Sequence, residues 1–452
     1  MQKTVGLLAI LFISSTLSVV TTPVWASASQ GRTWDRTFGE TGYELANSVQ
    51  QMPDGGYLVA GLSNSTGVNG FKVWVLRLDA AGNILWQKSY GGSMDEFARA
   101  MSLTSDGGFI VAADTLSFGV STYTTWIVRF NSDGDILWQN TYNGGSINTN
   151  SISQTSEGGY IVGRFVDQLI DGSLVMGPQL LKLNPDGSVA WAKTYEEASP
   201  AAGGFFGPAI TTQTSDGGFL LASTTGKFQG SPWVVKLDAM GNVVWQNEYL
   251  GTNDNFVSSA GQTHDGGFII AAGTTGLTSA TASFLRLNAD GSVKWEKAYP
   301  IGQAKPEGFS IQQTTDDGFI VAGGTGTLPD STLLLRLDPA GNIDWQQTYG
   351  QGVGLFSVQQ TRNGGFVAAG ARTGPGTGVN ALFLKVNSMA QIHPCGEVVP
   401  FNGTIVNANA TMSTTAALVI DSTVSANPTN ALATATSTNT TVLCPSHDAP
   451  AG

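Results

Sequence analysis

The chain has 452 residues, of which 58 are glycine and 12% are charged, and its net charge is −12. Glycine at about twice its average usage, with ordinary apolar content, argues against a helix bundle and favours a turn-rich β protein. Nucleic acid is excluded as a partner because a phosphate-binding surface needs clustered Lys and Arg, and the sequence has no such cluster.

Residues 1–28 have the layout of a secretory signal peptide. Lys3 precedes an apolar run over 5–20, and Ala26-Ser27-Ala28 follows as a small-residue cleavage site. The run is short for a spanning helix, and no later stretch approaches the needed length. We expect this leader to be removed and the rest of the chain to be secreted, periplasmic or held at the cell surface, with no membrane span. A retained anchor is the alternative.

A glycine turn then recurs seven times. It reads Asp-Gly-Gly-Tyr at 54–57 and Asp-Gly-Gly-Phe at 106–109, and the last two copies change to Asp-Asp-Gly-Phe at 316–319 and Asn-Gly-Gly-Phe at 363–366. A second signature follows each turn, as in Gly-Asn-Ile-Leu-Trp at 82–86. Repetition at this period indicates one structural unit copied along the chain.

Each unit predicts four short strands, A to D. In the first unit strand A is 48–51, the turn supplies the positive φ angles of a tight hairpin, and strand B is the apolar run 57–60. Strand C is 73–78, and strand D carries a tryptophan. Four strands in about 50 residues, arranged radially, make a propeller blade. The sequence thus predicts an all-β, seven-bladed β-propeller over residues 29–394.

The two ends of the repeat region predict how the ring closes. The seventh unit has a strand C at 382–387 but Pro394 where its tryptophan belongs, whereas an unassigned strand D at 33–39 precedes the first unit. We predict that the N-terminal strand completes the last blade, with 33–38 pairing beside 382–387. Such closure removes the exposed edges of an open ring.

Residues 395–452 differ in composition from the repeats. They are rich in Thr, Ala, Asn and Ser, and they contain no Lys or Arg. Cys395 and Cys444 are the protein's two cysteines, and in an exported chain they are expected to form a disulfide. The segment is expected to be either a small β appendage or a flexible tether.

Two side chains recur once per unit. The tryptophans are expected to pack between adjacent blades, the alternative being stacking on sugars or a quinone. The basic residue of strand C is expected to pair with a turn carboxylate such as Asp54 or Asp106, the alternative being a cationic ring that binds an anion. The tryptophans are Trp34, Trp86, Trp138, Trp191, Trp245, Trp295 and Trp345, and the basic residues are Arg77, Arg129, Lys182, Lys236, Arg286, Arg336 and Lys385.

Catalytic and metal-binding patterns are sparse. The spacings of the three histidines and two cysteines disfavour zinc, and His264 directly precedes a repeat turn where most other copies have a small hydroxylic residue. The sequence has no nucleophile elbow, phosphate-binding loop or calcium loop. We therefore expect no cofactor, no metal and no catalytic residue.

Alternating strand direction places the variable B–C and D–A loops on one face of the disc. Binding residues concentrate on loops held by a rigid scaffold, so this face is the candidate binding surface. Its acidic residues are expected to hold a cation, a basic peptide or a sugar, or to serve only for solubility. They are Glu44, Asp95, Glu96, Glu196, Glu197, Asp254 and Glu307.

The pattern Trp-x-x-x-Tyr-Gly-Gly at 86–92, with Asp-Gly-Gly-Tyr-Leu-Val-Ala-Gly at 54–61, resembles the tandem β-propeller repeats of secreted and surface proteins in bacteria and archaea. The likeness covers about 29–394 and implies location and fold more than chemistry. Quinoprotein-type propellers are more distantly similar, but residues 79–86 are one residue shorter than their docking motif, and eight blades would be expected.

Two functions follow as hypotheses. The first is a monomeric, non-catalytic exported propeller that binds a protein or polysaccharide through its variable-loop face. The second is a glycan-active hydrolase or lyase that uses acids such as Glu96 and Asp254 in the propeller mouth, and two carboxyls about 5–10 Å apart there would favour it. The first is favoured because nothing in the sequence specifies a nucleophile or a metal.

Overall fold

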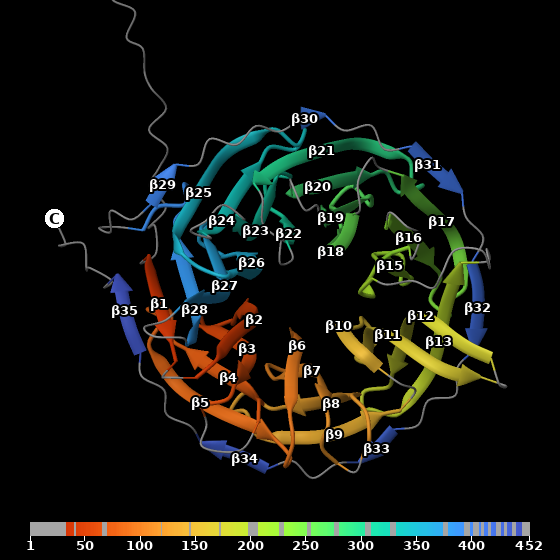
Figure 1. Cartoon of the computed structure of the whole chain (residues 1–452), viewed down its shortest axis with the longest axis horizontal. Coiled ribbons are helices and arrows are strands. Elements are labelled where there is room, and N and C mark those ends of the chain that lie inside the picture. Colours follow the sequence, from red (N-terminus) through yellow and green to blue (C-terminus); the bar gives the residue numbers. More distant parts are fainter. Residues whose placement is uncertain are drawn as a thin grey trace, which may run out of the picture.

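The computed structural model describes a closed ring of β-sheets (Figure 1). Residues 1–32, and with them the expected signal peptide, lie outside the described residues. The described part comprises residues 33–39, 42–65, 70–118, 120–143, 146–170, 173–197, 207–225, 230–250, 255–274, 280–302, 309–325, 331–373 and 378–392, together with seven short strands between 398 and 444.

The prediction of seven four-stranded blades is confirmed. Blade 1 consists of β2 (Glu44–Gln51), β3 (Tyr57–Ser63), β4 (Lys72–Leu78) and β5 (Ile84–Gly91). Blade 2 consists of β6 (Glu96–Leu103), β7 (Phe109–Thr115), β8 (Thr124–Phe130) and β9 (Ile136–Tyr142). Blade 3 consists of β10 (Ser146–Gln154), β11 (Tyr160–Ile170), β12 (Ser173–Leu183) and β13 (Val189–Glu197). Blade 4 consists of β14 (Ile210–Gln213), β15 (Phe219–Thr224), β16 (Pro232–Leu237) and β17 (Val243–Leu250). Blade 5 consists of β18 (Asn255–Gln262), β19 (Phe268–Thr274), β20 (Ala280–Leu287) and β21 (Val293–Gly302). Blade 6 consists of β22 (Ser310–Gln313), β23 (Phe319–Thr325), β24 (Ser331–Leu337) and β25 (Ile343–Gln351).

Blade 7 closes the ring as predicted. Its inner strands are β26 (Gly354–Gln360), β27 (Phe366–Thr373) and β28 (Val379–Val386), and its outer strand is the N-terminal β1 (Trp34–Phe38). β1 runs antiparallel to β28, with Trp34 opposite Lys385 and Phe38 opposite Ala381. Backbone hydrogen bonds to β28 therefore hold β1 in blade 7, and because the chain runs from β1 into β2, they join the last blade to the first.

The C-terminal segment forms a belt around the ring. It supplies β29 (Val398–Pro400), β30 (Val406–Asn407), β31 (Thr411–Thr414), β32 (Ala417–Asp421), β33 (Ala426–Pro428), β34 (Leu432–Ala435) and β35 (Thr440–Cys444). Each pairs antiparallel with the outer strand of one blade, in the order 6, 5, 4, 3, 2, 1 and 7, and Figure 1 shows these strands at the rim. The tail strands are thus distributed over seven sheets and are not gathered in one appendage.

Of the two cysteines in the expected disulfide, the described residues include Cys444 alone. Cys444 ends β35, where its backbone lies opposite Asp35 of β1. Cys395 lies outside the described residues, so the disulfide stays a prediction.

The core consists of apolar layers between adjacent blades. Strands B and C are buried on both faces, which is why they read as continuous apolar runs such as β3, whose residues are all buried. The turn before β3 favours glycine, because Gly55 has φ +90° and L side chains rarely adopt that conformation. Continuous apolar strands and short glycine turns therefore specify a stack of sheets.

Each repeat tryptophan packs against the strand-B aromatic of the next blade. Ring centroids lie 5.7 Å apart for Trp34 and Tyr57 and 5.7 Å apart for Trp245 and Phe268, and similar pairs occur at the other five junctions. The strand-D tyrosine adds a hydrogen bond across most junctions, as where Tyr249 Oη donates to Gly291 O at 2.6 Å. The tryptophan therefore links every outer strand to the neighbouring blade, and the tyrosine strengthens this link at most junctions.

Glutamines at the end of strand A make a second set of links. In six junctions the glutamine Oε1 accepts the N–H of the turn residue in the preceding blade, as from Ser215 to Gln262 at 2.7 Å. At the junction of blades 1 and 2 these two positions hold Pro53, which has no N–H, and Leu103. There Gln50 reaches forward, and its Oε1 accepts the Leu103 N–H at 2.9 Å.

Candidate functional site

The two faces of the disc differ in regularity. One face carries the A–B and C–D turns, which are nearly identical in every blade, and we call it the turn face. The other carries the variable B–C and D–A loops, and we call it the loop face. The acidic residues predicted to form a binding surface belong to the loop face.

Glu44 and Glu96 begin strand A of blades 1 and 2 and are fully buried. Ser63 Oγ donates to Glu44 Oε1 at 3.1 Å. Lys72 forms an ion pair with Glu96 at 3.0 Å between Nζ and Oε2, and Thr115 Oγ1 donates to the other carboxylate oxygen at 3.2 Å. Both glutamates therefore anchor loops inside the blades and do not face an external ligand.

The other predicted acids are placed differently. Asp95 is half-buried, and its Oδ1 accepts the Phe71 N–H at 2.8 Å, which fixes the end of the B–C loop of blade 1. Glu196 and Glu197 end β13, where their backbones pair with the belt strand β32. Asp254 and Glu307 lie outside the described residues. The described members of the set thus do not gather into one acidic cluster.

An aromatic row occupies the loop face of blades 1 and 2. It consists of Tyr43, Phe71, Phe97 and Tyr123, with successive ring centroids 5.9, 5.3 and 5.8 Å apart. Tyr43 is 36% exposed, and the other three side chains are half-buried. A chain of four partly exposed rings held by strand ends is an amphipathic surface of the kind that proteins use for recognition.

An ion pair between Arg99 and Asp114 contacts the aromatic row at Phe97. Arg99 lies over the Phe97 ring, 5.5 Å from its centroid, and its Nε donates to Asp114 Oδ2 at 2.7 Å. Asp114 is fully buried and also accepts the Thr149 N–H at 3.0 Å, which connects the pair to blade 3. Burial raises the pKa of Asp114, although the Arg99 guanidinium opposes this shift. Arg99 therefore presents a partly exposed cation beside the aromatic rings.

Sequence reasoning missed the aromatic row because its members do not recur in every blade. One signal was available: Phe71 and Tyr123 both stand directly before strand C, in blades 1 and 2. The partners Tyr43 and Phe97 come from the beginnings of strand A in the same two blades, so only the fold brings the four residues together.

On the turn face, the strand-C cations pair with turn carboxylates in six blades, which agrees with the expectation for Asp54 and Asp106. The basic side chains are at most 8% exposed, and the acids are at least 52% exposed. Partial burial acts to raise the pKa of Asp216, but hydrogen bonds from Lys236 and Thr214 lower it to about 2. The pairs are Arg77–Asp54, Arg129–Asp106, Lys182–Glu157, Lys236–Asp216, Arg286–Asp265 and Arg336–Asp316.

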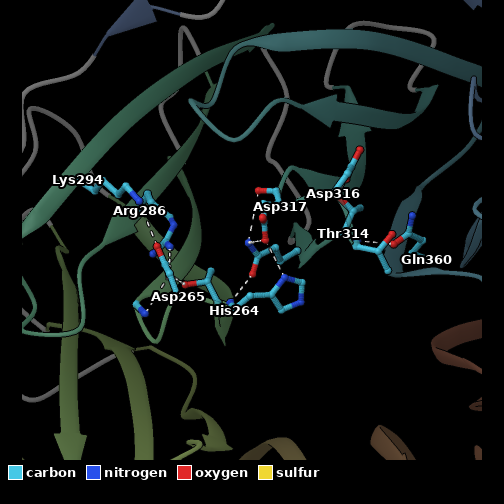
Figure 2. A network of polar contacts seen from close by, with 12 residues as sticks. His264, Asp265, Arg286, Lys294, Thr314, Asp316, Asp317 and Gln360 are labelled. Atoms are coloured by element: carbon cyan, nitrogen blue, oxygen red, sulfur yellow. Dashed lines mark hydrogen bonds and ion pairs between the residues drawn. The ribbon is translucent and has the colours of Figure 1, made fainter. Parts of the chain in front are cut away.

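Figure 2 shows a variation at the junction of blades 5 and 6. Asp317 replaces the first turn glycine and keeps its positive φ, at +66°. Its Oδ1 lies 2.8 Å from His264 Nδ1 of the preceding blade, and Lys294 adds a second cation to Asp265 at 3.1 Å. His264 thus forms a bridge between blades.

Comparisons with known proteins find no matching family model and no matching curated protein. Among solved structures, the chain is similar to Sqt1 of Chaetomium thermophilum bound to the N-terminus of the ribosomal protein L10, with 13% identity, a TM-score of 0.43, and coverage of 78% of this chain and 98% of that one. It is also similar to a protein of unknown function from Dyadobacter fermentans, with 12% identity, a TM-score of 0.42, and coverage of 79% and 99%.

Two further observations concern metals and membranes. Within the described ranges, no group of three or more His, Cys, Asp or Glu side chains is arranged to hold a metal ion. The same part of the chain contains no helix long and apolar enough to cross a membrane.

Proposed function

We propose that this protein is an exported, non-catalytic binding module that holds a polysaccharide or protein ligand on its loop face. The observation that carries the proposal is the aromatic row Tyr43, Phe71, Phe97 and Tyr123 with Arg99 beside it. Aromatic rings supply large contact areas at little entropic cost, and tyrosine hydroxyls and a guanidinium add directional hydrogen bonds.

The rigidity of the scaffold supports this assignment. The row lies on strands of two blades that are fixed in a ring closed by β1, so little conformational order has to be created on binding. A preformed surface of this kind suits recognition of an extended ligand that crosses from one blade to the next. The predicted leader supplies the reason for placing the ligand outside the cytoplasm.

The glycan-active alternative needs two accessible carboxyls. Glu96, one of the acids considered for that role, is buried and ion-paired with Lys72. A general acid must reach the glycosidic oxygen, so Glu96 is better described as a structural residue. Asp254 lies outside the described residues.

A thermal-shift screen tests the proposal. The purified chain is mixed with soluble polysaccharides and, separately, with divalent cations plus a chelator control, because a ligand that binds only the folded state raises the melting temperature. A polysaccharide that raises it is then tested on a double variant, Tyr43→Ser with Tyr123→Ser, which is expected to lose most of the shift. Product analysis of the same mixtures separates a binder from an enzyme.

A matched control is available on the opposite face. Met240 is 66% exposed in a C–D turn of blade 4, so Met240→Ser removes exposed apolar area without touching the loop face. This variant is expected to bind like the wild type. Equal binding by the wild type and the double tyrosine variant would contradict the role of the aromatic row, and a flat polysaccharide panel would favour a protein ligand.

A further inference from the structure

A cavity of about 500 Å³ lies on the turn face where blade 7 meets blade 1. Its volume falls in the range of small-molecule sites, about 300–1,000 Å³. It lies between the A–B turns of the two blades and the C–D turn of blade 1. Its lining residues are Gln51, Pro53, Asp54, Gly55, Tyr57, Ala80, Ala81, Arg362, Asn363 and Lys385.

The buried cation in this cavity lacks the carboxylate that its six counterparts have. Lys385 is 2% exposed, and the turn residue facing it is Asn363, where the other blades have Asp or Glu. Lys385 Nζ donates to Val386 O at 3.1 Å and, weakly, to Asn363 Oδ1 at 3.4 Å. An ammonium group has three donors, and within the described ranges no carboxylate pairs with this one.

A second cation lines the same cavity. Arg362 occupies the turn position that holds Ser in blades 2, 3 and 4. Its Nη1 donates to Met52 O at 3.0 Å and to Pro53 O at 2.7 Å, both in blade 1. The cavity also contains the Asp54 carboxylate, but Asp54 is already paired with Arg77. Lys385 and Arg362 therefore leave the cavity with an excess of positive charge.

We propose that this cavity binds a small carboxylate ligand, held between Lys385 and Arg362. In six blades the equivalent cation pairs with a carboxylate of the chain itself, so this cation position favours a carboxylate partner. In blade 7 the Asn363 carboxamide contributes N–H donors and no negative charge, so an external carboxylate meets no repulsion from position 363.

This site differs from the loop-face site in place and in chemistry. It lies at the opposite face of the disc and contains charged groups instead of a row of aromatic rings. The carboxylate can belong to a free organic acid or to a uronic acid unit of a polysaccharide, and the two sources share the same chemistry. The inference does not depend on the proposed function, and either one can fail without the other.

Calorimetric titration of the purified chain tests the site. The probes are succinate, galacturonate and polygalacturonate, with sodium chloride at matched ionic strength and sulfate as non-carboxylate controls. We expect saturable binding of at least one carboxylate probe. Asn363→Asp restores the acidic residue type of the other blades and gives Lys385 an internal carboxylate partner, so it is expected to weaken binding at least about tenfold while keeping the fold.

Two more variants separate the site from general charge effects. Arg362→Ser introduces the residue of blades 2 to 4 and is expected to weaken binding. Asp216→Asn in blade 4 removes the carboxylate partner of Lys236. Blade 4 has Ser215 at the position of Arg362, so this variant gains no second cation and is expected to bind the probes like the wild type. Binding that is unchanged in Asn363→Asp, equal for sulfate and carboxylates, or absent for every carboxylate probe would overturn the proposal.

Discussion

The junction of blades 7 and 1 and that of blades 4 and 5 solve the same packing problem with different residues. Between blades 4 and 5, Trp245 Nε1 donates to Ala289 O at 3.1 Å and Tyr249 Oη donates to Gly291 O. Between blades 7 and 1, Phe38 stands where the tyrosine is expected, so the hydroxyl contact is missing. At this junction Arg36 donates to Ala81 O at 2.9 Å and to Asn83 Oδ1 at 3.0 Å.

The difference reflects how each junction is made. Blade 4 is one continuous segment, whereas the outer strand of blade 7 comes from the other end of the repeat region and has to be held there. Trp34 is fully buried, and Arg36 lies 5.7 Å from the centroid of its ring, while Trp245 is only half-buried. The tryptophan of the closing strand is therefore more buried than its counterpart, and Lys385, which contacts Asn363, lies opposite it on β28.

Replacement of the buried tryptophan is expected to have the largest effect. Trp34→Ala removes a fully buried aromatic side chain from the closing strand, which costs about 3–5 kcal/mol of unfolding free energy. Trp245→Ala is expected to cost clearly less, because that ring is half-exposed before the change. Chemical denaturation of both variants measures the difference, and equal losses would show that the closing junction is no tighter than the others.

The unpaired lysine predicts a pH dependence of intermediate size. Burial lowers the pKa of Lys385 from 10.5 to about 8. Between about pH 8 and 10.5, Lys385 is therefore protonated in the unfolded chain and neutral in the folded one. The free energy of unfolding rises with pH across that window, by up to about 3 kcal/mol from this group. Below pH 8 the folded protein carries the full cost of burying the charged Lys385 side chain.

Asn363→Asp isolates this contribution from other titrating groups. The variant gives Lys385 a carboxylate, so it is expected to be more stable than the wild type near pH 7, and the gap is expected to close as the pH rises towards 10.5. Guanidinium unfolding midpoints at several pH values measure the gap. A constant gap across the window would contradict the role assigned to Lys385.

The glutamine links predict the smallest effect. Gln262→Leu removes the acceptor of the Ser215 N–H and copies the residue found at position 103, with an expected loss of at most about 1 kcal/mol. The double change Pro53→Ser with Leu103→Gln builds the corresponding link between blades 1 and 2 and is expected to gain a similar amount. Unfolding of the two variants side by side is the measurement, and a gain from Gln262→Leu would be the contrary result.

The sequence predicts the ring because the information is repeated and local. Glycine turns and apolar strands recur in every unit, and the misplaced tryptophan strand at 33–39 has only one vacant position to fill. Pairing of the cations with turn carboxylates follows for the same reason. Each of these features can be inferred from the contrast between one copy and the others.

The belt and the aromatic row were not predictable in this way. The belt strands have 2 to 5 residues and pair with outer strands, never with each other, so they leave no periodic signal in the sequence. Tyr43 and Tyr123 come from blades 1 and 2, and they meet only through Phe71 and Phe97. Contacts between unique residues of different copies require the three-dimensional arrangement.

The direction of the belt sets an order of release. It passes the blades in reverse, and its last strand, β35, covers β1, the strand that closes the ring. With the expected disulfide reduced, a carboxypeptidase or a pulling force that acts from the C-terminal end therefore removes the belt strand of blade 7 first, then that of blade 1, then that of blade 2. The belt strand that is lost first is the one that covers the closing strand, so damage to the C-terminal segment reaches the junction of blades 7 and 1 before any other part of the ring.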